Sequence, residues 1–281
     1  MLWSDINLNL LERLEPFVVS HRANWHALDL APLGVAIATS RRYDPTHLAS
    51  AGVLEGLTRL DHLTFGDQGM GTPRWVLFDC GAFPGIVVGF GQRANSLPAP
   101  LIYAYGVRPS DAFVPLSMWV AVPCAEPGAW FGHNLSSANI GLPRHQRLPG
   151  LGTLTKALGL SVTRAARQYG ATQWRSPALP LHLRFGPLHL RSAWTPTHTH
   201  PATLTYRLDV DPTRLRAVAG VEPPPSVPEG DRRIAVTNDA ALHGLQVEIE
   251  GGDDWTLVGF SESEGQRCAE LKRYPALPDG A

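Results

Sequence analysis

The chain has 281 residues, of which 44% are hydrophobic and 17% charged, a composition typical of a globular protein with its own core. Its 24 basic and 25 acidic residues give a net charge of −1. Because no run of like charges occurs, neither nucleic-acid binding nor a membrane-surface patch is expected. Three widely spaced cysteines indicate a reduced, cytoplasmic setting. Asp5 and Glu12 argue against a signal peptide, and no apolar run reaches the ~20 residues of a membrane helix.

The first half of the chain alternates short apolar runs with one long amphipathic segment. After Asp44-Pro45, a good helix start, leucines recur at helical spacing and predict a helix over 44–65. The apolar runs predict strands at 33–40, 75–81, 85–91, 100–106, 117–123 and 129–140. We expect the runs within 75–91 to form a β-hairpin, and those within 117–140 to form an antiparallel pair.

In the second half, apolar residues about four positions apart predict a helix over 153–169, which Gly170 would end. Further strands are expected at 171–176, 189–194, 203–210, 234–238, 245–251 and 254–260. The proline-rich stretch 221–231 has no periodicity and predicts a semi-rigid linker or surface loop. These features divide the chain into a main domain, a linker and a small β-rich appendage, at 1–215, 216–231 and 232–281.

The stretch from Arg147 to Gly152 precedes the second predicted helix and has the chemistry of an anion site. The first turn of a helix has backbone N–H groups without an intrahelical partner, and the helix dipole adds partial positive charge there. Glycines at 150 and 152 allow a ligand to approach the backbone closely. A phosphate or pyrophosphate therefore fits this turn. The alternative is a tight turn before a surface helix, since the stretch lacks the ending of a P-loop and the third glycine of a dinucleotide fingerprint.

The order Arg147-x-x-Gly150-x-Gly152, after antiparallel strands and before a helix, resembles the acyl-CoA-binding motif of the GNAT acyltransferase superfamily. In that family, backbone amides of the loop hold the pyrophosphate of coenzyme A. The resemblance implies an α+β fold, a mixed and largely antiparallel central sheet flanked by helices. It also implies that the cofactor-binding residues are Arg147, Gly150, Leu151, Gly152 and Thr153. Lys156 lies one turn into the predicted helix, where it could reach a phosphate of the cofactor; a solvent-facing lysine is the alternative.

A second segment extends the resemblance, which then covers roughly residues 33–210. The family often continues with N-x-x-A-x-x-x-Y-x-x-x-G-F, in which the tyrosine is a general acid towards the departing thiolate. Here Ala178 and Gly186 keep their register, and His182 stands in the position of the tyrosine. The resemblance therefore implies that His182 is the proton donor, with a structural histidine as the alternative.

His133 is the candidate general base, because histidine suits proton transfer near neutral pH. It lies in the polar cluster 132–137 within an otherwise apolar strand pair, just before the glycine turn. A hydrogen-bonded structural network is the alternative explanation of this cluster. Glu126, which precedes the same strand, is a second candidate base. His198 and His200 lie two apart without a third ligand nearby, so no metal site is expected.

The leading hypothesis is an acyltransferase that moves an acyl group from acyl-CoA, or from the phosphopantetheine of an acyl-carrier protein, to an amine or hydroxyl acceptor. One alternative is a double hot-dog protein that hydrolyses or dehydrates thioesters. Another is a non-catalytic acyl-CoA-binding protein. The expected partners are a small-molecule acceptor and, for one donor, a carrier protein; whether the chain forms a homodimer stays open.

Overall fold

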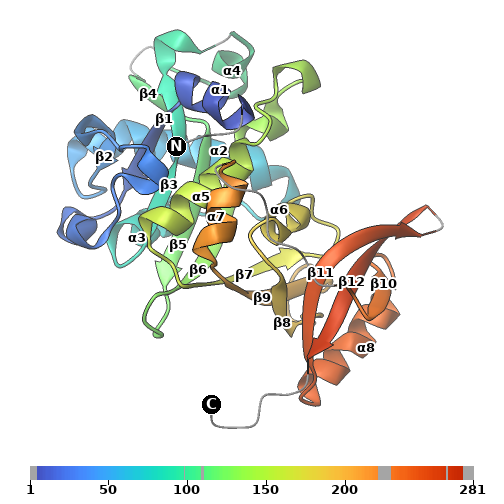
Figure 1. Cartoon of the computed structure of the whole chain (residues 1–281). Coiled ribbons are helices and arrows are strands. Elements are labelled where there is room, and N and C mark those ends of the chain that lie inside the picture. The colour runs from blue at the N-terminus through green and yellow to red at the C-terminus, as the bar shows by residue number, and fades with distance from the viewer. Residues whose placement is uncertain (1–4, 98, 109–110, 221–228, 264, 275–281) are drawn as a thin grey trace. The chain divides into compact units, whose positions relative to one another are not determined.

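The computed structural model describes residues 5–97, 99–108, 111–220, 229–263 and 265–274 (Figure 1). The chain forms two compact units. The first comprises Met1–Ala165 with Ala219–Val221, and the second comprises Ala166–Val218 with Glu222–Ala281. The main domain predicted over 1–215 thus spans the first unit and the opening part of the second.

The sheet of the first unit has the strand order β2-β1-β3-β5-β6, with β4 paired to β3 outside this path. The two-residue β2 runs parallel to β1, and the other pairs are antiparallel. The strands are β1 Glu15–Val19, β2 Arg42–Tyr43, β3 Ile86–Arg93, β4 Phe113–Pro115, β5 Ser117–Pro123 and β6 Ala129–Ser137. The glycine turn therefore follows an antiparallel meander, of which β6 is the last strand.

One face of this sheet is covered by α5, Leu151–Val162, which lies across β3 and β5 (Figure 1). The hydroxyls of Thr155 on the helix and Ser117 on β5 form a buried hydrogen bond of 2.6 Å. One turn further on, Gly159 lies directly against the indole of Trp119. The missing side chain at Gly159 thus lets the helix approach the sheet closely.

The other face is covered by α2, Ala51–Phe65. Asn134 of β6 donates a hydrogen bond to Asp61 of this helix. Asn134 is paired with Val120, the residue after Trp119, and successive strand residues point to opposite faces. Since Trp119 faces α5, the helices α2 and α5 enclose the same sheet from its two sides.

The remaining helical segments of the first unit are short. The α-helices are α1 Asp5–Arg13, α3 Arg74–Ala82 and α4 Ala99–Ala104. The 3₁₀ turns are η1 Arg22–Ala27, η2 Pro32–Gly34, η3 Thr39–Arg41, η4 Leu48–Ser50, η5 Gly66–Gln68, η6 Ala94–Ser96, η7 Ala138–Gly141 and η8 Arg144–Gln146.

The second unit contains an antiparallel sheet with the order β7-β9-β8-β11-β12-β10. Its strands are β7 Arg167–Gln173, β8 Leu188–Ser192, β9 Thr203–Asp209, β10 Arg232–Ala235, β11 Asp254–Ser263 and β12 Gln266–Tyr274. Its helices are α6 Leu179–Leu183, α7 Pro212–Val218 and α8 Asp239–Glu250. The buried side chains include Leu188, Leu190, Tyr206, Leu208 and Leu257.

The α+β class and the largely antiparallel sheet flanked by helices are confirmed. The antiparallel pair predicted within 117–140 is also confirmed as β5 and β6, and the strand expected at 85–91 is β3. In the second unit, β8, β9 and β11 lie where strands were expected. Among the described residues, no helix is long and apolar enough to cross a membrane.

Three of the strand predictions in the first half are wrong. Residues 75–81 belong to α3 and most of 100–106 to α4. The stretch 33–40 is irregular, because Leu33 and Gly34 have φ values of 53° and 78°, which interrupt an extended chain. Short apolar runs do not distinguish a strand from a buried helix segment. Because 75–81 is helical, the β-hairpin predicted within 75–91 does not form.

Helix α3 shows the periodicity that the strand interpretation missed. Leu77 and Gly81 are buried four residues apart, whereas Trp75 and Phe78 are exposed. That burial pattern is helical, since a strand would alternate its exposure at every second residue. Pro73, which has no N–H group to lose, precedes the first turn.

Each of the two long helices differs from its predicted range at one end. α2 begins at Ala51, because the carboxylate of Asp44 instead holds a turn, accepting from the N–H groups of Arg22 and Thr46 at 3.1 and 3.0 Å. α5 ends at Val162, after which Arg164 takes a left-handed conformation with φ of 49°. Part of the predicted helix, from Arg167 onwards, is therefore strand β7.

The C-terminal region contains a helix as well as strands. The strand predicted at 245–251 is wrong, because these residues lie in and just after α8. Asn238 caps this helix by accepting from the N–H of Ala241 at 3.0 Å, and Leu242 and Leu245 are buried on one side. Of the predicted linker, 221–228 lies outside the described residues.

The Gly159 contact leads to a stability prediction. A Cβ atom at Gly159 would overlap an indole carbon of Trp119, so Gly159→Ala should lower the free energy of unfolding by about 1–3 kcal/mol through overpacking. Gly52→Ala in α2 is the control, since no atom lies within 4 Å of the added carbon. Urea unfolding measures both, and equal midpoints would contradict the close-approach argument.

Candidate functional site

The glycine turn ends in a left-handed residue that starts α5. Gly150 is the N-cap, with φ of 81° and ψ of −12°, a conformation that glycine adopts without strain. The first intrahelical hydrogen bond runs from the N–H of Leu154 to the carbonyl of Gly150 at 2.9 Å. The N–H of Gly152 precedes this bond, in the turn that carries the helix's partial positive charge.

The loop that leads to Gly150 is fixed by one asparagine side chain. Asn139 Nδ2 donates to the carbonyl of Leu148 at 2.8 Å, and Asn139 Oδ1 accepts from the N–H of Leu148 at 2.6 Å. Arg147 Nε donates to the carbonyl of Leu142 at 3.2 Å. The path of the turn is therefore set by hydrogen bonds within the protein before any ligand binds.

The two basic residues predicted to bind the cofactor have different environments. Arg147 is exposed beside the turn. Lys156 is completely buried within α5, and this burial lowers its pKa well below the usual value. In this conformation, Arg147 is therefore the basic group available to a ligand at the surface of the turn, and a phosphate contact of Lys156 stays a prediction.

His133 occupies a β-bulge in the middle of β6. The pairing with β5 runs from Val120 opposite Asn134 to Ala121 opposite Gly132, so His133 has no partner of its own. A bulge of this kind bends the strand and changes the direction of its side chains, and bulges are frequent next to active sites. The predicted polar cluster thus coincides with an irregularity of the sheet.

A carboxylate that the sequence analysis did not select lies beside this bulge. Asp61 of α2 has an exposed fraction of 1%. Its carboxylate accepts from Asn134 Nδ2 at 2.6 Å and from the N–H of Thr72. The same amide of Asn134 also donates to Thr72 Oγ1 at 2.8 Å. The signal in the sequence was an acidic residue next to Leu60, on the apolar side of an amphipathic helix.

The pKa values of His133 and Asp61 are coupled. Although His133 is partly open to solvent, desolvation by the surrounding atoms lowers its pKa, and the charge of Asp61 acts in the opposite direction. Burial raises the pKa of Asp61, against the effect of hydrogen bonds from Thr72. A lowered pKa keeps the His133 imidazole neutral, and so able to accept a proton, near pH 7.

The other two catalytic candidates lie elsewhere. Glu126 is in the turn between β5 and β6, where its carbonyl accepts from the N–H of Ala129 at 3.1 Å. The nine residues of β6 separate this turn from the glycine loop by roughly 25 Å. His182 belongs to α6 of the second unit, has an exposed fraction of 7%, and packs against the ring of Tyr206 at 5.5 Å. The structure thus places Asp61 in contact with Asn134, the neighbour of His133, and does not bring Glu126 to the loop.

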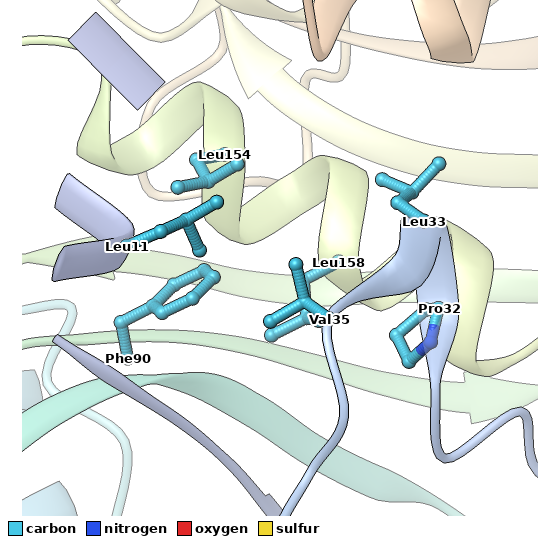
Figure 2. A pocket seen from close by; sticks show the side chains of 7 residues that line it. All are labelled: Leu11, Pro32, Leu33, Val35, Phe90, Leu154 and Leu158. Carbon is cyan, nitrogen blue, oxygen red and sulfur yellow. The ribbon is translucent and has the colours of Figure 1, made fainter. Parts of the chain in front are cut away.

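An apolar pocket lies in the first unit beside α5 (Figure 2). It has a volume of about 10 Å³, which is close to the space of a single water molecule. Its lining is Leu11, Pro32, Leu33, Val35, Phe90, Leu154 and Leu158. In this conformation the pocket is too small for an acyl chain.

Histidines 198 and 200 face each other with ring centroids 6.0 Å apart. Within the described ranges, no group of three or more His, Cys, Asp or Glu residues is placed to hold a metal ion.

No protein-family model matches the chain, and a search of curated proteins gives no match. The case for a function therefore rests on the chemistry of the residues described above.

Asn139→Ala should loosen the glycine turn. It removes both hydrogen bonds to Leu148, which is buried with an exposed fraction of 4%, and unpaired buried backbone groups cost about 1–3 kcal/mol. Asn95→Ala, at an exposed site in η6, is the matched control. Denaturant unfolding gives the free energies, and faster hydrogen exchange of the Leu148 amide should accompany the loss. Unchanged exchange would mean that Asn139 does not hold the turn.

Proposed function

We propose that this protein is a GNAT-type acyltransferase that moves an acyl group from acyl-CoA, or from a carrier-bound phosphopantetheine, to an amine or hydroxyl acceptor. The observation that carries the proposal is Gly150, a left-handed N-cap between an antiparallel meander and α5. Helix N-termini of this kind bind phosphates through backbone N–H groups and the helix dipole. The N–H of Gly152 is the proposed donor for the pyrophosphate, with Arg147 as a charged neighbour.

The arrangement of the first unit favours this function over the double hot-dog alternative. A double hot-dog requires each long helix to be cradled by a sheet of its own. Here α2 and α5 lie on opposite faces of one sheet, through Asn134 on one side and Trp119 on the other. The order of antiparallel strands, loop and helix is the order that the GNAT motif requires.

The chemistry needs three contributions from the protein. The backbone turn positions the donor, and a backbone N–H group polarises the thioester carbonyl, which gains negative charge in the transition state. His133, which is neutral near pH 7, accepts the proton that the attacking amine or hydroxyl loses. His133 lies in the bulge of β6, the strand that is followed by η7, η8 and then Gly150.

A non-catalytic acyl-CoA-binding protein is the second candidate. It is favoured by His182, which stands in the position of the family's general acid and is almost completely buried. Stoichiometric binding of acyl-CoA without turnover of any amine or hydroxyl acceptor would support this candidate. Turnover that survives His182→Gln would instead show that His182 is not required as an acid.

Thermal unfolding with coenzyme A, acetyl-CoA and longer acyl-CoAs tests the site. Saturating ligand should raise the stability of the folded state, by about 2.7 kcal/mol at one hundred times the dissociation constant. Gly150→Ala forces a side chain into a left-handed conformation, at a cost of about 1–2 kcal/mol, and should also abolish most of the ligand-induced shift.

Gly106→Ala is the matched control for backbone strain. Gly106 also has positive φ, at 53°, with nothing within 4 Å of an added Cβ, and it lies outside the turn. This variant should lose stability but keep the full ligand-induced shift. Equal shifts in both variants would mean that coenzyme A binds elsewhere, and no shift with any ligand would remove the support for coenzyme A as donor.

His133→Gln should reduce kcat/KM roughly 10²–10⁴-fold, the usual contribution of a general base. Glu126→Gln is the control, because Glu126 is separated from the loop by the whole of β6, and it should retain near wild-type activity. Steady-state kinetics with a thiol-detecting assay measures both. A larger loss in Glu126→Gln than in His133→Gln would reverse the assignment.

A further inference from the structure

The bulge in β6 places His133 directly beside Asn134, which is hydrogen-bonded to Asp61 of α2. In a regular strand, His133 and Asn134 would point to opposite faces of the sheet. Because His133 is the extra residue of the bulge, this alternation is interrupted. Asn134 reaches Asp61 through a hydrogen bond of 2.6 Å, and the charge of Asp61 also acts on His133. Asn134 is thus bonded to the carboxylate of Asp61, and its neighbour His133 lies within the field of that charge.

Asp61 is held rigidly enough to act as an anchor. Its carboxylate is buried and takes hydrogen bonds from Asn134 and from the N–H of Thr72. A buried carboxylate is costly unless it is hydrogen-bonded, and these donors supply the compensation. The strand bulge, the segment that precedes α3 and the helix α2 therefore meet at one charged group.

We propose that Asp61 is a positioning residue for His133, so that the carboxylate of α2 and the imidazole of β6 form the proton-transfer pair of the enzyme. This role rests on the proposed acyltransferase function. Asp61 itself touches no reacting atom: it fixes the bulge through Asn134, and its negative charge favours the protonated form of His133.

The nitrogen or oxygen of the acceptor forms a bond to the carbonyl carbon of the acyl thioester, and the C–S bond breaks. The proton of the acceptor passes to a ring nitrogen of His133, which becomes an imidazolium. The thiolate leaves with the electron pair of the C–S bond and takes up a proton from solvent. The negative charge of Asp61 stabilises the imidazolium while it exists.

Other charged groups around His133 are already engaged or face elsewhere. Glu55 of α2 forms ion pairs with Arg74 and Arg108. Arg59 of the same helix pairs with Asp111. These partners lie outside β6. β5 carries no ionisable side chain, and α5 carries only Lys156, on the opposite face of the sheet. Of the remaining ionisable side chains on α2, His62 is exposed. Asp61 is therefore the charged partner whose removal should change His133.

Titration of the full-length protein by NMR tests the pair directly. The His133 ring signal is identified by its loss in His133→Gln. In Asp61→Asn, the pKa of His133 should fall, because the negative charge that favours the imidazolium is gone. Asp67→Asn, which changes an exposed carboxylate shortly after α2, should leave the pKa of His133 unchanged. An unchanged His133 titration in Asp61→Asn would overturn the proposal.

The kinetic readout separates positioning from simple stability. Activity that depends on neutral His133 is lost as the pH falls through its pKa, so Asp61→Asn should move the acid limb of the kcat/KM profile to lower pH. The plateau should also drop roughly tenfold or more, since a displaced base works poorly. A variant that is merely less stable would show a lower unfolding midpoint and an unmoved acid limb, which would also overturn the proposal.

Asn134→Ala covers the case in which Asp61→Asn does not fold. It keeps the charge of Asp61 but removes the anchor of the bulge, so kcat should fall while the pKa of His133 stays close to that of the wild type. Wild-type kcat in Asn134→Ala would overturn the positioning role. Absence of turnover with any thioester in the wild-type protein would refute the acyltransferase function itself, whereas the NMR titration would still report whether the two groups are coupled.

Discussion

The contact between Gly159 of α5 and Trp119 of β5 determines how closely the helix lies on the sheet of the first unit. Trp119 is among the largest completely buried side chains of the chain, and the glycine lets the helix pass over it without a gap. A rigid helix that is fixed at this point also has a fixed N-terminus. The position of the Gly150 turn relative to β6 is therefore a consequence of core packing nine residues away.

The sequence was most informative where local chemistry and tertiary packing favour the same structure. β5 is an apolar strand, and a proline- and glycine-containing turn joins it to β6; the two pair as expected, apart from the bulge at His133. The glycine turn was also found, since Gly150 needs a left-handed backbone that few other residues adopt. Strands were predicted at 75–81 and 245–251 because the apolar residues of such short stretches also fit a strand. Their side chains are instead buried with the periodicity of a helix.

The partners of His133 could not be predicted from the sequence for a different reason. A bulge depends on the register of two strands, which a single chain segment does not contain. Asp61 and Thr72 are 73 and 62 positions from Asn134 in the chain, respectively, and only the packing of α2 on β6 brings them together. His133 itself was recognisable as a histidine among polar strand residues, but the carboxylate that modifies its chemistry was not.

The burial of Lys156 has a practical consequence for chemical labelling. The chain contains only two lysines, Lys156 and Lys272. Since Lys156 is enclosed in the core and Lys272 is partly open on β12, amine-directed reagents should attach to one lysine of the native protein, in addition to the α-amino group. A fluorophore or crosslinker introduced in this way would mark a single known position in the second unit, without any engineered cysteine.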